Sequence, residues 1–308
     1  FWQQQLDKIF SERVPIKIQI AQFNPTVGDI KFNAKKMLDL TIEAHDSGAH
    51  LIIFPELALT GYPPEDLLLR DGFIQQVKDA ILGFCDLAPS TISILFGAPS
   101  KVDGLLFNSA YLVQNNRILH VYNKQELPNY GVFDEKRYFS PGNESFIFEC
   151  QNTKIGVLIC EDQWIDGPIT KLCQSNVDTV ISLNASPFQL NKQSERIDIC
   201  KNYASKFDIT FIYVNMVGGQ DEVVFDGNSF VVNRMGDVSL QLPAFEEVSA
   251  SHTDKTIISS VVSNEASVYS AIVLATRDYI NKNAFSGALI GLSGGIDSAL
   301  TLAIAVDA

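Results

Sequence analysis

The chain has 308 residues, 46% hydrophobic and 19% charged, so it can bury a large core in one large or two smaller domains. Its formal net charge of -13, with acidic and basic residues interspersed, argues against a nucleic-acid or anionic-membrane partner and leaves small molecules as the expected ligands. No segment has the roughly 18 to 20 uninterrupted apolar residues of a membrane helix, and residues 1–14 lack a signal-peptide pattern, so we expect a cytoplasmic protein.

Short apolar segments rich in β-forming residues recur along the chain. The expected strands cover residues 16–23, 50–56, 91–98, 109–113, 154–161, 178–185, 209–215 and 229–233. Several are continuously apolar, as in strands that are covered on both faces. Helical patterns lie between many of them, such as residues 33–48, where Asn33 can cap the first turn and Gly48 can end the last. This alternation predicts a layered α/β fold.

The pattern changes after Pro243. Residues 247–263 are polar and weakly patterned, which predicts a linker between a first domain, 1–246, and a second that begins at 264. The second begins with a helical pattern that leads into an apolar strand at 288–292, a glycine loop and another helix. The expected inner face of the first of these helices comprises Tyr269, Ile272, Val273, Thr276 and Ile280.

Cys160 is the most suggestive of the five cysteines, which also include Cys85, Cys150, Cys173 and Cys200. Their odd number and the absence of CxxC spacing favour free thiols over a disulfide framework or a zinc site. Cys160 ends an apolar strand, and two carboxylates, Glu161 and Asp162, follow it. A strand cysteine is often only a packing residue, and a nucleophilic thiol needs a neighbouring base. With only four histidines in the chain, none clustered, a carboxylate is the expected base.

Two further residues complete a candidate site. Glu56 lies where an apolar strand runs into a proline turn. A carboxylate there has a high desolvation cost unless it forms an ion pair or takes part in the protein's function. Lys124 follows another strand in a loop that contains Tyr130, Phe133 and Glu135. Most lysines are solvated surface residues, but this loop can hold an ammonium group in a partly dry pocket.

These residues lie in long motifs, including "QFNPTVGD", "PELALTGYPPEDLL", "KQELPNYGVFDEKRYFSPG", "LICEDQW", "NASPF" and "YVNMVGGQDEVVFDGNSF". Together they resemble the nitrilase superfamily, and within it the glutaminase domain of glutamine-dependent NAD synthetases. The resemblance runs from about Ile16 to the end of the chain. It implies an αββα sandwich for residues 1–246.

The resemblance also implies roles. Glu56 would be the general base, Cys160 the nucleophile, and Lys124, with the backbone N–H of Glu161, the support of the oxyanion. Glu135 would orient Lys124 and Glu56, although an ordinary ion pair is equally consistent with the sequence. The implied glutamine-binding residues are Tyr130, Ser186 and Lys192, then Glu161 and Trp164. Arg196 competes with Lys192 for the carboxylate of glutamine, and the sequence leaves that choice open.

The segment "GLSGGIDS", residues 291–298, is not a Walker A motif because it lacks the lysine, yet its glycines and the following helix suit an anion. It resembles the pyrophosphate loop of ATP pyrophosphatases, which implies an ATP site formed by Gly291, Leu292, Ser293, Gly294, Gly295, Ile296, Asp297 and Ser298. Mg²⁺ can offset the charge of Asp297. No metal site is certain within the chain.

A synthetase of this family would use ATP to adenylate deamido-NAD, and ammonia from glutamine would reach it through an internal tunnel. We therefore expect residues 264–308 to be the first part of a synthetase domain that continues beyond Ala308, and the whole enzyme to be a homo-oligomer. Two alternatives remain at this point. One is a stand-alone nitrilase-type amidase or carbamoylase, which would not need residues 291–298, and the other is a catalytically silent assembly module.

Overall fold

A computed structural model describes residues 16–253 and 263–308 as a mixed α/β structure with two large sheets. All eight strands expected within residues 16–233 are present, and several shorter strands join them. The expected linker, 247–263, includes a strand at Val248–Ser251, and its residues 254–262 lie outside the described residues. Among the described residues, no helix combines the length and apolarity that crossing a membrane requires.

The first sheet has six strands, and its central members run parallel. In spatial order they are β14 (Val248–Ser251), β1 (Ile18–Gln22), β2 (Leu51–Ile53), β3 (Ser93–Val102), β4 (Leu105–Gln114) and β5 (Arg117–Asn123). β1, β2 and β3 are parallel, and the remaining neighbours are antiparallel.

The second sheet repeats this plan. In spatial order it contains β13 (Val238–Gln241), β12 (Phe230–Val232), β9 (Thr210–Asn215), β8 (Thr179–Asn184), β7 (Thr153–Ile159) and β6 (Phe146–Cys150). β7, β8 and β9 are parallel. A separate hairpin of β10 (Val217–Gln220) and β11 (Val223–Asp226) extends beyond this sheet.

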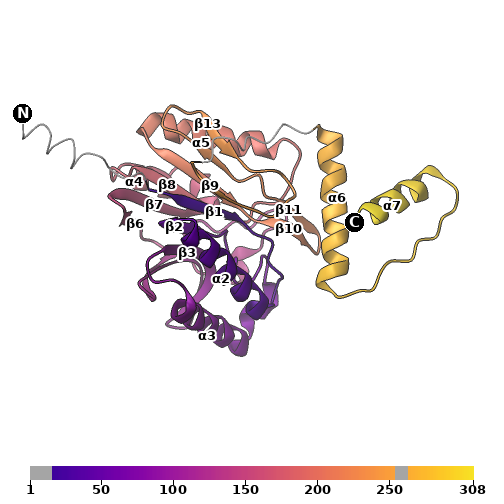
Figure 1. Ribbon diagram of the computed structural model, residues 1–308, viewed down its shortest axis with the longest axis horizontal. Coiled ribbons are helices and arrows are strands. Elements are labelled where there is room, and N and C mark those ends of the chain that lie inside the picture. Colours follow the sequence, from indigo (N-terminus) through magenta and orange to yellow (C-terminus); the bar gives the residue numbers. More distant parts are fainter. Residues whose placement is uncertain (1–15, 254–262) are drawn as a thin grey trace, which may run out of the picture.

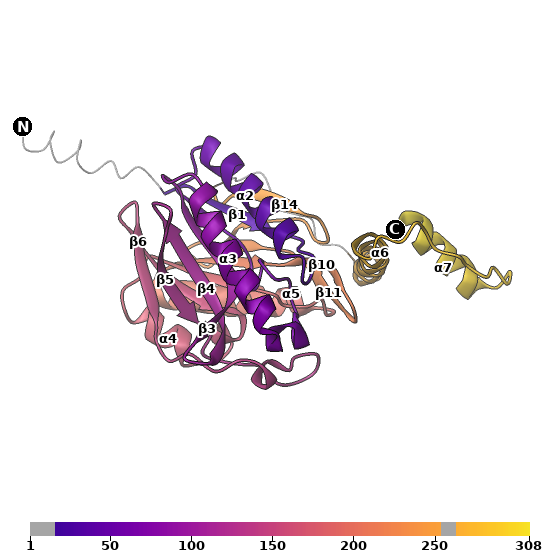
Figure 2. The ribbon, with the colours of Figure 1, turned by 90° about the horizontal axis from the view of Figure 1, so that it is seen from below.

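The two sheets pack face to face, and helices cover their outer faces (Figures 1 and 2). The layer between the sheets takes apolar side chains from both, for example Ile53 and Leu95 from the first and Ile159 and Leu183 from the second. The helices are α2 (Ile30–Asp46) and α3 (Asp71–Leu87) on the first sheet, and α4 (Pro168–Cys173) and α5 (Lys192–Phe207) on the second. This is the αββα sandwich that the resemblance to the nitrilase superfamily implies.

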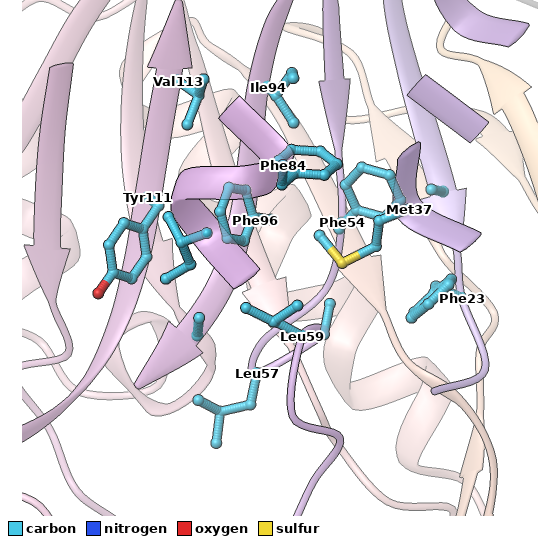
Figure 3. Close-up of a cluster of buried hydrophobic side chains, with 14 of the residues drawn as sticks. Phe23, Met37, Phe54, Leu57, Leu59, Phe84, Ile94, Phe96, Tyr111 and Val113 are labelled. Carbon is cyan, nitrogen blue, oxygen red and sulfur yellow. The ribbon is translucent and has the colours of Figure 1, made fainter. Parts of the chain in front are cut away.

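Aromatic side chains fill the layer between the first sheet and its helices (Figure 3). Phe96 of β3 stacks on Tyr111 of β4 with ring centroids 5.5 Å apart, and Phe84 of α3 meets Phe96 edge-on. Phe54 and Leu57, which flank Glu56, are fully buried in the same cluster. Packing of this kind fixes the backbone on both sides of Glu56.

Three short 3-10 helices complete the sandwich: η1 (Glu65–Leu69), η2 (Glu135–Arg137) and η3 (Cys160–Gln163). The capping expected of Asn33 is wrong. Helix α2 begins at Ile30, and its N-terminal cap is Asp29, whose carboxylate accepts a hydrogen bond from the N–H of Phe32. Asn33 lies inside the helix, where its amide is bonded to Thr26 and Leu59.

Helix α6 (Asn264–Lys282) lies against the β10–β11 hairpin, and α7 (Ile296–Asp307) follows it after a loop (Figure 1). The inner face of α6 agrees with the expected one only in part: Val273 is buried as expected, but Ala271, Leu274 and Asp278 are the other buried residues and Ile272 is exposed. The expected strand at 288–292 is also not formed: these residues have no regular structure. A strand needs a hydrogen-bonded partner, and no described strand pairs with this segment.

Candidate active site

The carboxyl ends of several strands bring the candidate residues to one edge of the sandwich. Glu56 follows β2, Lys124 follows β5, Cys160 follows β7, and Ser186 follows β8. The ends of parallel strands in α/β sheets commonly hold ligands because backbone loops and side chains converge there.

Glu56 is 1% exposed, and both of its carboxylate oxygens are hydrogen-bonded. Oε1 accepts from Lys124 Nζ and from Asn108 Nδ2, each at 2.7 Å, and Oε2 accepts from the backbone N–H of Ala185 at 2.9 Å. Gly97 of β3 lets the Glu56 segment lie this deep, because a Cβ at position 97 would overlap the backbone of Pro55, Glu56 and Leu57.

Lys124 is 1% exposed and links two carboxylates. Its Nζ donates to Glu56 Oε1 at 2.7 Å and to Glu135 Oε1 at 2.8 Å. Burial lowers the pKa of Lys124, but the charges of Glu135 and Glu56 outweigh it, so the net pKa is well above the usual value. The described residues use two of the three N–H bonds of the ammonium group. The third can stabilise negative charge on a bound molecule.

Glu135 has an unequal environment at its two oxygens. Oε1 accepts from Lys124 and from Tyr62 Oη at 2.8 Å, whereas Oε2 has no hydrogen-bond partner among the described residues. Glu135 also borders a cavity of about 160 Å³. Burial raises the pKa of Glu135 to about 7, although the Lys124 ammonium opposes this shift.

Cys160 begins the turn η3 and is 4% exposed. Its φ of 46° lies in the left-handed region, which is costly for a residue with a Cβ and is characteristic of functional turns. Burial and the Glu56 carboxylate raise the pKa of the Cys160 thiol well above its usual value, and Lys124 only partly opposes them. The resting thiol is therefore protonated, and its proton has a carboxylate acceptor nearby.

The structure also adds two residues to the site that the sequence did not single out for a role. The side-chain amide of Asn108, in β4, donates a hydrogen bond to Glu56. The backbone carbonyl of Asn108 accepts from the backbone N–H of Lys124 at 2.8 Å. Asp162 accepts hydrogen bonds from the loops that carry Lys124 and Cys160. Both were detectable in principle, since a polar side chain within or next to a buried apolar strand must find partners.

The expected glutamine-binding residues surround the Cys160 turn. Tyr130, 59% exposed, donates its hydroxyl to both carboxylate oxygens of Glu161 at 3.0 Å. The Lys192 ammonium lies 4.0 Å from the ring centre of Trp164 and pairs with Glu195 at 2.8 Å. Acidic, basic and aromatic groups therefore lie around this turn.

Ser186 is held in place by its neighbours. Its N–H donates to Asn215 Oδ1 at 2.9 Å, and its hydroxyl accepts from Arg196 Nε at 3.2 Å. Arg196 itself is fully buried, pairs with Asp226 at 2.9 Å, and donates to the carbonyls of Ser186 and Pro187. Its guanidinium is thus committed to protein partners, which favours Lys192 over Arg196 as the group that meets a carboxylate.

Residues 291–295 are an exposed loop, and residues 296–298 are the first turn of α7. Gly294 has a φ of +87°, the Ser293 and Ser298 hydroxyls lie 3.1 Å apart, and Gly295 caps the helix. The helix start near Ile296 is confirmed. All five cysteines are free and buried, and within residues 16–253 and 263–308 no group of three or more His, Cys, Asp or Glu side chains could hold a metal ion.

Known proteins resemble this chain in sequence and structure. Residues 17–260 match the carbon-nitrogen hydrolase family, and residues 268–308 match the NAD synthase family. A glutamine-dependent NAD(+) synthetase from Acinetobacter baylyi is 43% identical over an alignment of 301 positions, and the match covers 95% of this chain and 55% of that protein. A glutamine-dependent NAD(+) synthetase from Thermotoga maritima is 34% identical over an alignment of 336 positions, and the match covers 95% of this chain and 58% of that protein.

Solved structures agree with these matches. A glutamine-dependent NAD+ synthetase from Acinetobacter baumannii, in complex with ADP, superposes with a TM-score of 0.90 at 43% identity and covers 95% of this chain and 57% of its own. An amidase of the nitrilase superfamily from Nesterenkonia, 22% identical, superposes with a TM-score of 0.68 over 76% of this chain and 88% of its own, which shows the shared fold. The chain spans little more than half the length of the curated relatives it matches.

Proposed function

Because the chain belongs to the carbon-nitrogen hydrolase family, we propose that it hydrolyses the side-chain amide of L-glutamine at Cys160 and supplies the ammonia to an NAD synthetase. The observation that carries this proposal is the buried Glu56–Lys124–Glu135 cluster, whose charges act on the Cys160 thiol. The match of residues 268–308 to NAD synthase favours this function over a stand-alone amidase.

In the proposed reaction Glu56 takes the proton of the Cys160 thiol as sulfur attacks the amide carbon of glutamine. Lys124 and the backbone N–H of Glu161 stabilise the negative charge that develops on the carbonyl oxygen. The carbon–nitrogen bond then breaks, and Glu56 returns its proton to the departing ammonia. A γ-glutamyl thioester remains on Cys160. Water, deprotonated by Glu56, hydrolyses this thioester and releases glutamate and the thiol.

Substrate binding is assigned to side chains around the Cys160 turn. Glu161, which Tyr130 holds by its hydroxyl, suits the α-ammonium of glutamine. Lys192, with Ser186 nearby along the chain, suits the α-carboxylate, since Arg196 is already paired with Asp226. The Trp164 ring supports the Lys192 ammonium from one side.

The second part of the proposal concerns residues 264–308 as the start of a synthetase domain. The N–H groups of the 291–295 loop and the N-terminus of α7 would hold phosphates of ATP, which enters with Mg²⁺. ATP adenylates the carboxylate of deamido-NAD with release of pyrophosphate, and channelled ammonia displaces AMP. A cytoplasmic location and a homo-oligomeric assembly are parts of the same proposal.

The test follows glutamate and ammonia after addition of glutamine to the wild type, to Cys160→Ala and to Cys200→Ala. Cys200 lies on α5 and is buried in a different hydrophobic cluster from Cys160, so it serves as the matched thiol control. We expect release by the wild type and Cys200→Ala and none by Cys160→Ala. Turnover that survives in Cys160→Ala would remove the proposed nucleophile.

A further inference from the structure

The Asp162 carboxylate is fully buried and lies two residues after the proposed nucleophile. Four neutral groups donate to it. Oδ1 accepts from the N–H of Gln125 at 2.9 Å and of Glu126 at 2.8 Å. Oδ2 accepts from Tyr122 Oη at 2.7 Å and from the N–H of Ile159 at 3.1 Å. Burying a charge is costly, and four directed hydrogen bonds offset that cost.

The donors belong to two segments that are distant in sequence. Tyr122, Gln125 and Glu126 flank Lys124 on both sides, whereas Ile159 immediately precedes Cys160. The Asp162 carboxylate therefore joins the loop of Lys124 to the turn of Cys160. Oδ1 accepts from two N–H groups of the loop, and Oδ2 accepts from one donor on each side. An ionised carboxylate can accept at both oxygens at once, whereas an amide carries a donor on one side.

The turn at Cys160 needs such support. Its φ of 46° is unfavourable for a residue with a Cβ, so surrounding contacts must hold it. The bond from Ile159 N–H to Asp162 closes the turn around this residue. On the other side, the bonds from Gln125 and Glu126 fix the backbone just after Lys124, whose Nζ must stay within reach of the reacting carbonyl oxygen.

We propose that Asp162 is a positioning residue of the glutaminase reaction, which sets the Cys160 thiol relative to the Lys124 ammonium without contacting the substrate. This inference rests on the proposed function. It differs from a purely structural role in one respect: loss of the carboxylate must lower the rate of chemistry at Cys160 in protein that remains folded and still binds glutamine.

The test uses Asp162→Asn in the full-length protein. Asparagine has nearly the same shape but offers a donor where Oδ1 or Oδ2 must accept, so it loses either the loop amides or Ile159 N–H. Because misplacement by about 1 Å can cost 10²-fold, we expect kcat for glutamine to fall roughly 10- to 100-fold. KM should stay within about threefold, since Tyr130, Ser186 and Lys192 are untouched.

A second readout is the rate at which iodoacetamide alkylates Cys160, followed by peptide mass spectrometry that separates it from the other four cysteines. We expect this rate to fall about tenfold or more in Asp162→Asn. Tyr122→Phe removes one of the four donors and should lower kcat and alkylation by a smaller factor, about threefold. Asp166→Asn, at an exposed carboxylate beyond the same turn, is the matched control and should match the wild type.

The outcomes separate the two proposals. If the wild type does not hydrolyse glutamine, the proposed function fails, and the alkylation rates still decide the positioning role. Values of kcat and alkylation within twofold of the wild type in folded Asp162→Asn would overturn the inference. Should Asp162→Asn fail to fold, Tyr122→Phe takes its place, and unchanged values in that variant would overturn it.

Discussion

Lys124 shows how strongly the site depends on a single buried charge. It is enclosed with Glu56 and Glu135, both buried, so its removal leaves two carboxylates without their cation. We expect Lys124→Ala to lower the free energy of unfolding by about 3–5 kcal/mol. It should also lower kcat by about 10²–10³-fold. Urea unfolding and glutamine turnover measure the two effects.

Lys101 provides the matched comparison for stability. It forms an ion pair with Asp71 at 2.7 Å, but both side chains are exposed. Exposed pairs contribute about 0–1 kcal/mol, so Lys101→Ala should change stability by no more than that and leave turnover unchanged. If Lys124→Ala lowers the free energy of unfolding no more than Lys101→Ala does, the role given to the buried cluster is contradicted.

Glu135 gives the site a pH-dependent contribution to stability. Burial raises its pKa from 4.5 to about 7, so between these values the folded protein holds a proton that the unfolded chain has lost. A carboxyl group whose pKa is higher in the folded protein than in the unfolded chain stabilises the fold fully at pH values below its pKa in the unfolded chain. This stabilisation disappears as the pH rises through the pKa in the folded protein. Glu135→Gln lacks this contribution.

The free energy of unfolding of the wild type, measured relative to Glu135→Gln, should therefore be larger near pH 5 than near pH 8, by a difference on the order of 2 kcal/mol. Urea titrations of both proteins at the two pH values provide the measurement. An unchanged or opposite difference would mean that Glu135 remains ionised across this range.

The residues of the site were easier to predict from the sequence than the hydrogen bonds and ion pairs that join them. Glu56, Lys124 and Cys160 each follow an apolar strand, and that local pattern is visible in the sequence. The roles of Asn108 and Asp162 depend on which loops meet in space, which no local pattern encodes. The ion pair of Arg196 with Asp226, 30 residues away, also depends on the fold, and it favours Lys192 as the proposed partner of the glutamine carboxylate.

At the scale of elements, the close contact between β3 and the Glu56 segment depends on Gly97. A Cβ there would lie 2.7 Å from both Pro55 O and the carbonyl carbon of Glu56, and these are backbone atoms that cannot move cheaply. Gly97→Ala should displace Glu56 and lower kcat by about 10-fold or more, because small displacements of a base are expensive. Steady-state kinetics check this.

Gly83, in the middle of α3, is the control because nothing lies within 4 Å of the position that a Cβ would take there, and its φ is not positive. Gly83→Ala should retain full activity and stabilise the protein by about 0.5–1 kcal/mol. Equal activity in the two alanine variants would show that the Glu56 segment does not need the close approach.

The strand pattern of the sandwich was predictable because continuous apolar segments mark strands covered on both sides. The ends of helices and strands were harder to predict. Asn33 is as good a capping residue as Asp29, and only the packing of α2 onto Thr26 and Leu59 decides that Asn33 turns inward. The apolar segment 288–292 has strand composition, yet composition does not supply the neighbouring strand that a ladder requires.

At the scale of the whole molecule, α6 is attached to the sandwich by a polar anchor. Asp278 Oδ2 accepts from Asn24 Nδ2 at 2.9 Å and from the N–H of Gly219 at 2.7 Å, and it pairs with Lys282 at 3.1 Å. The same hairpin continues to Phe225, whose ring meets Tyr62 beside Glu135. The unit that begins the proposed synthetase thus contacts a hairpin that reaches the proposed glutaminase site.

Asp278→Ala should loosen this attachment, because it leaves the Gly219 N–H and the Asn24 side-chain amide without their acceptor and removes the charge that pairs with Lys282. Hydrogen exchange of the α6 amides should become about 10-fold or more faster, while exchange in β8 stays unchanged. Glu265→Ala, at the exposed start of the same helix, is the control. Equal α6 exchange in the two variants would contradict the anchoring role of Asp278.

The central claim, that Cys160 carries the reaction through a thioester, is tested most directly by acid-quenching the enzyme during turnover of labelled glutamine and mapping the label by peptide mass spectrometry. The account predicts a γ-glutamyl adduct on the peptide that contains Cys160, and none in Cys160→Ala. Glutamine turnover with no adduct on that peptide, or with the label on another cysteine, would contradict it.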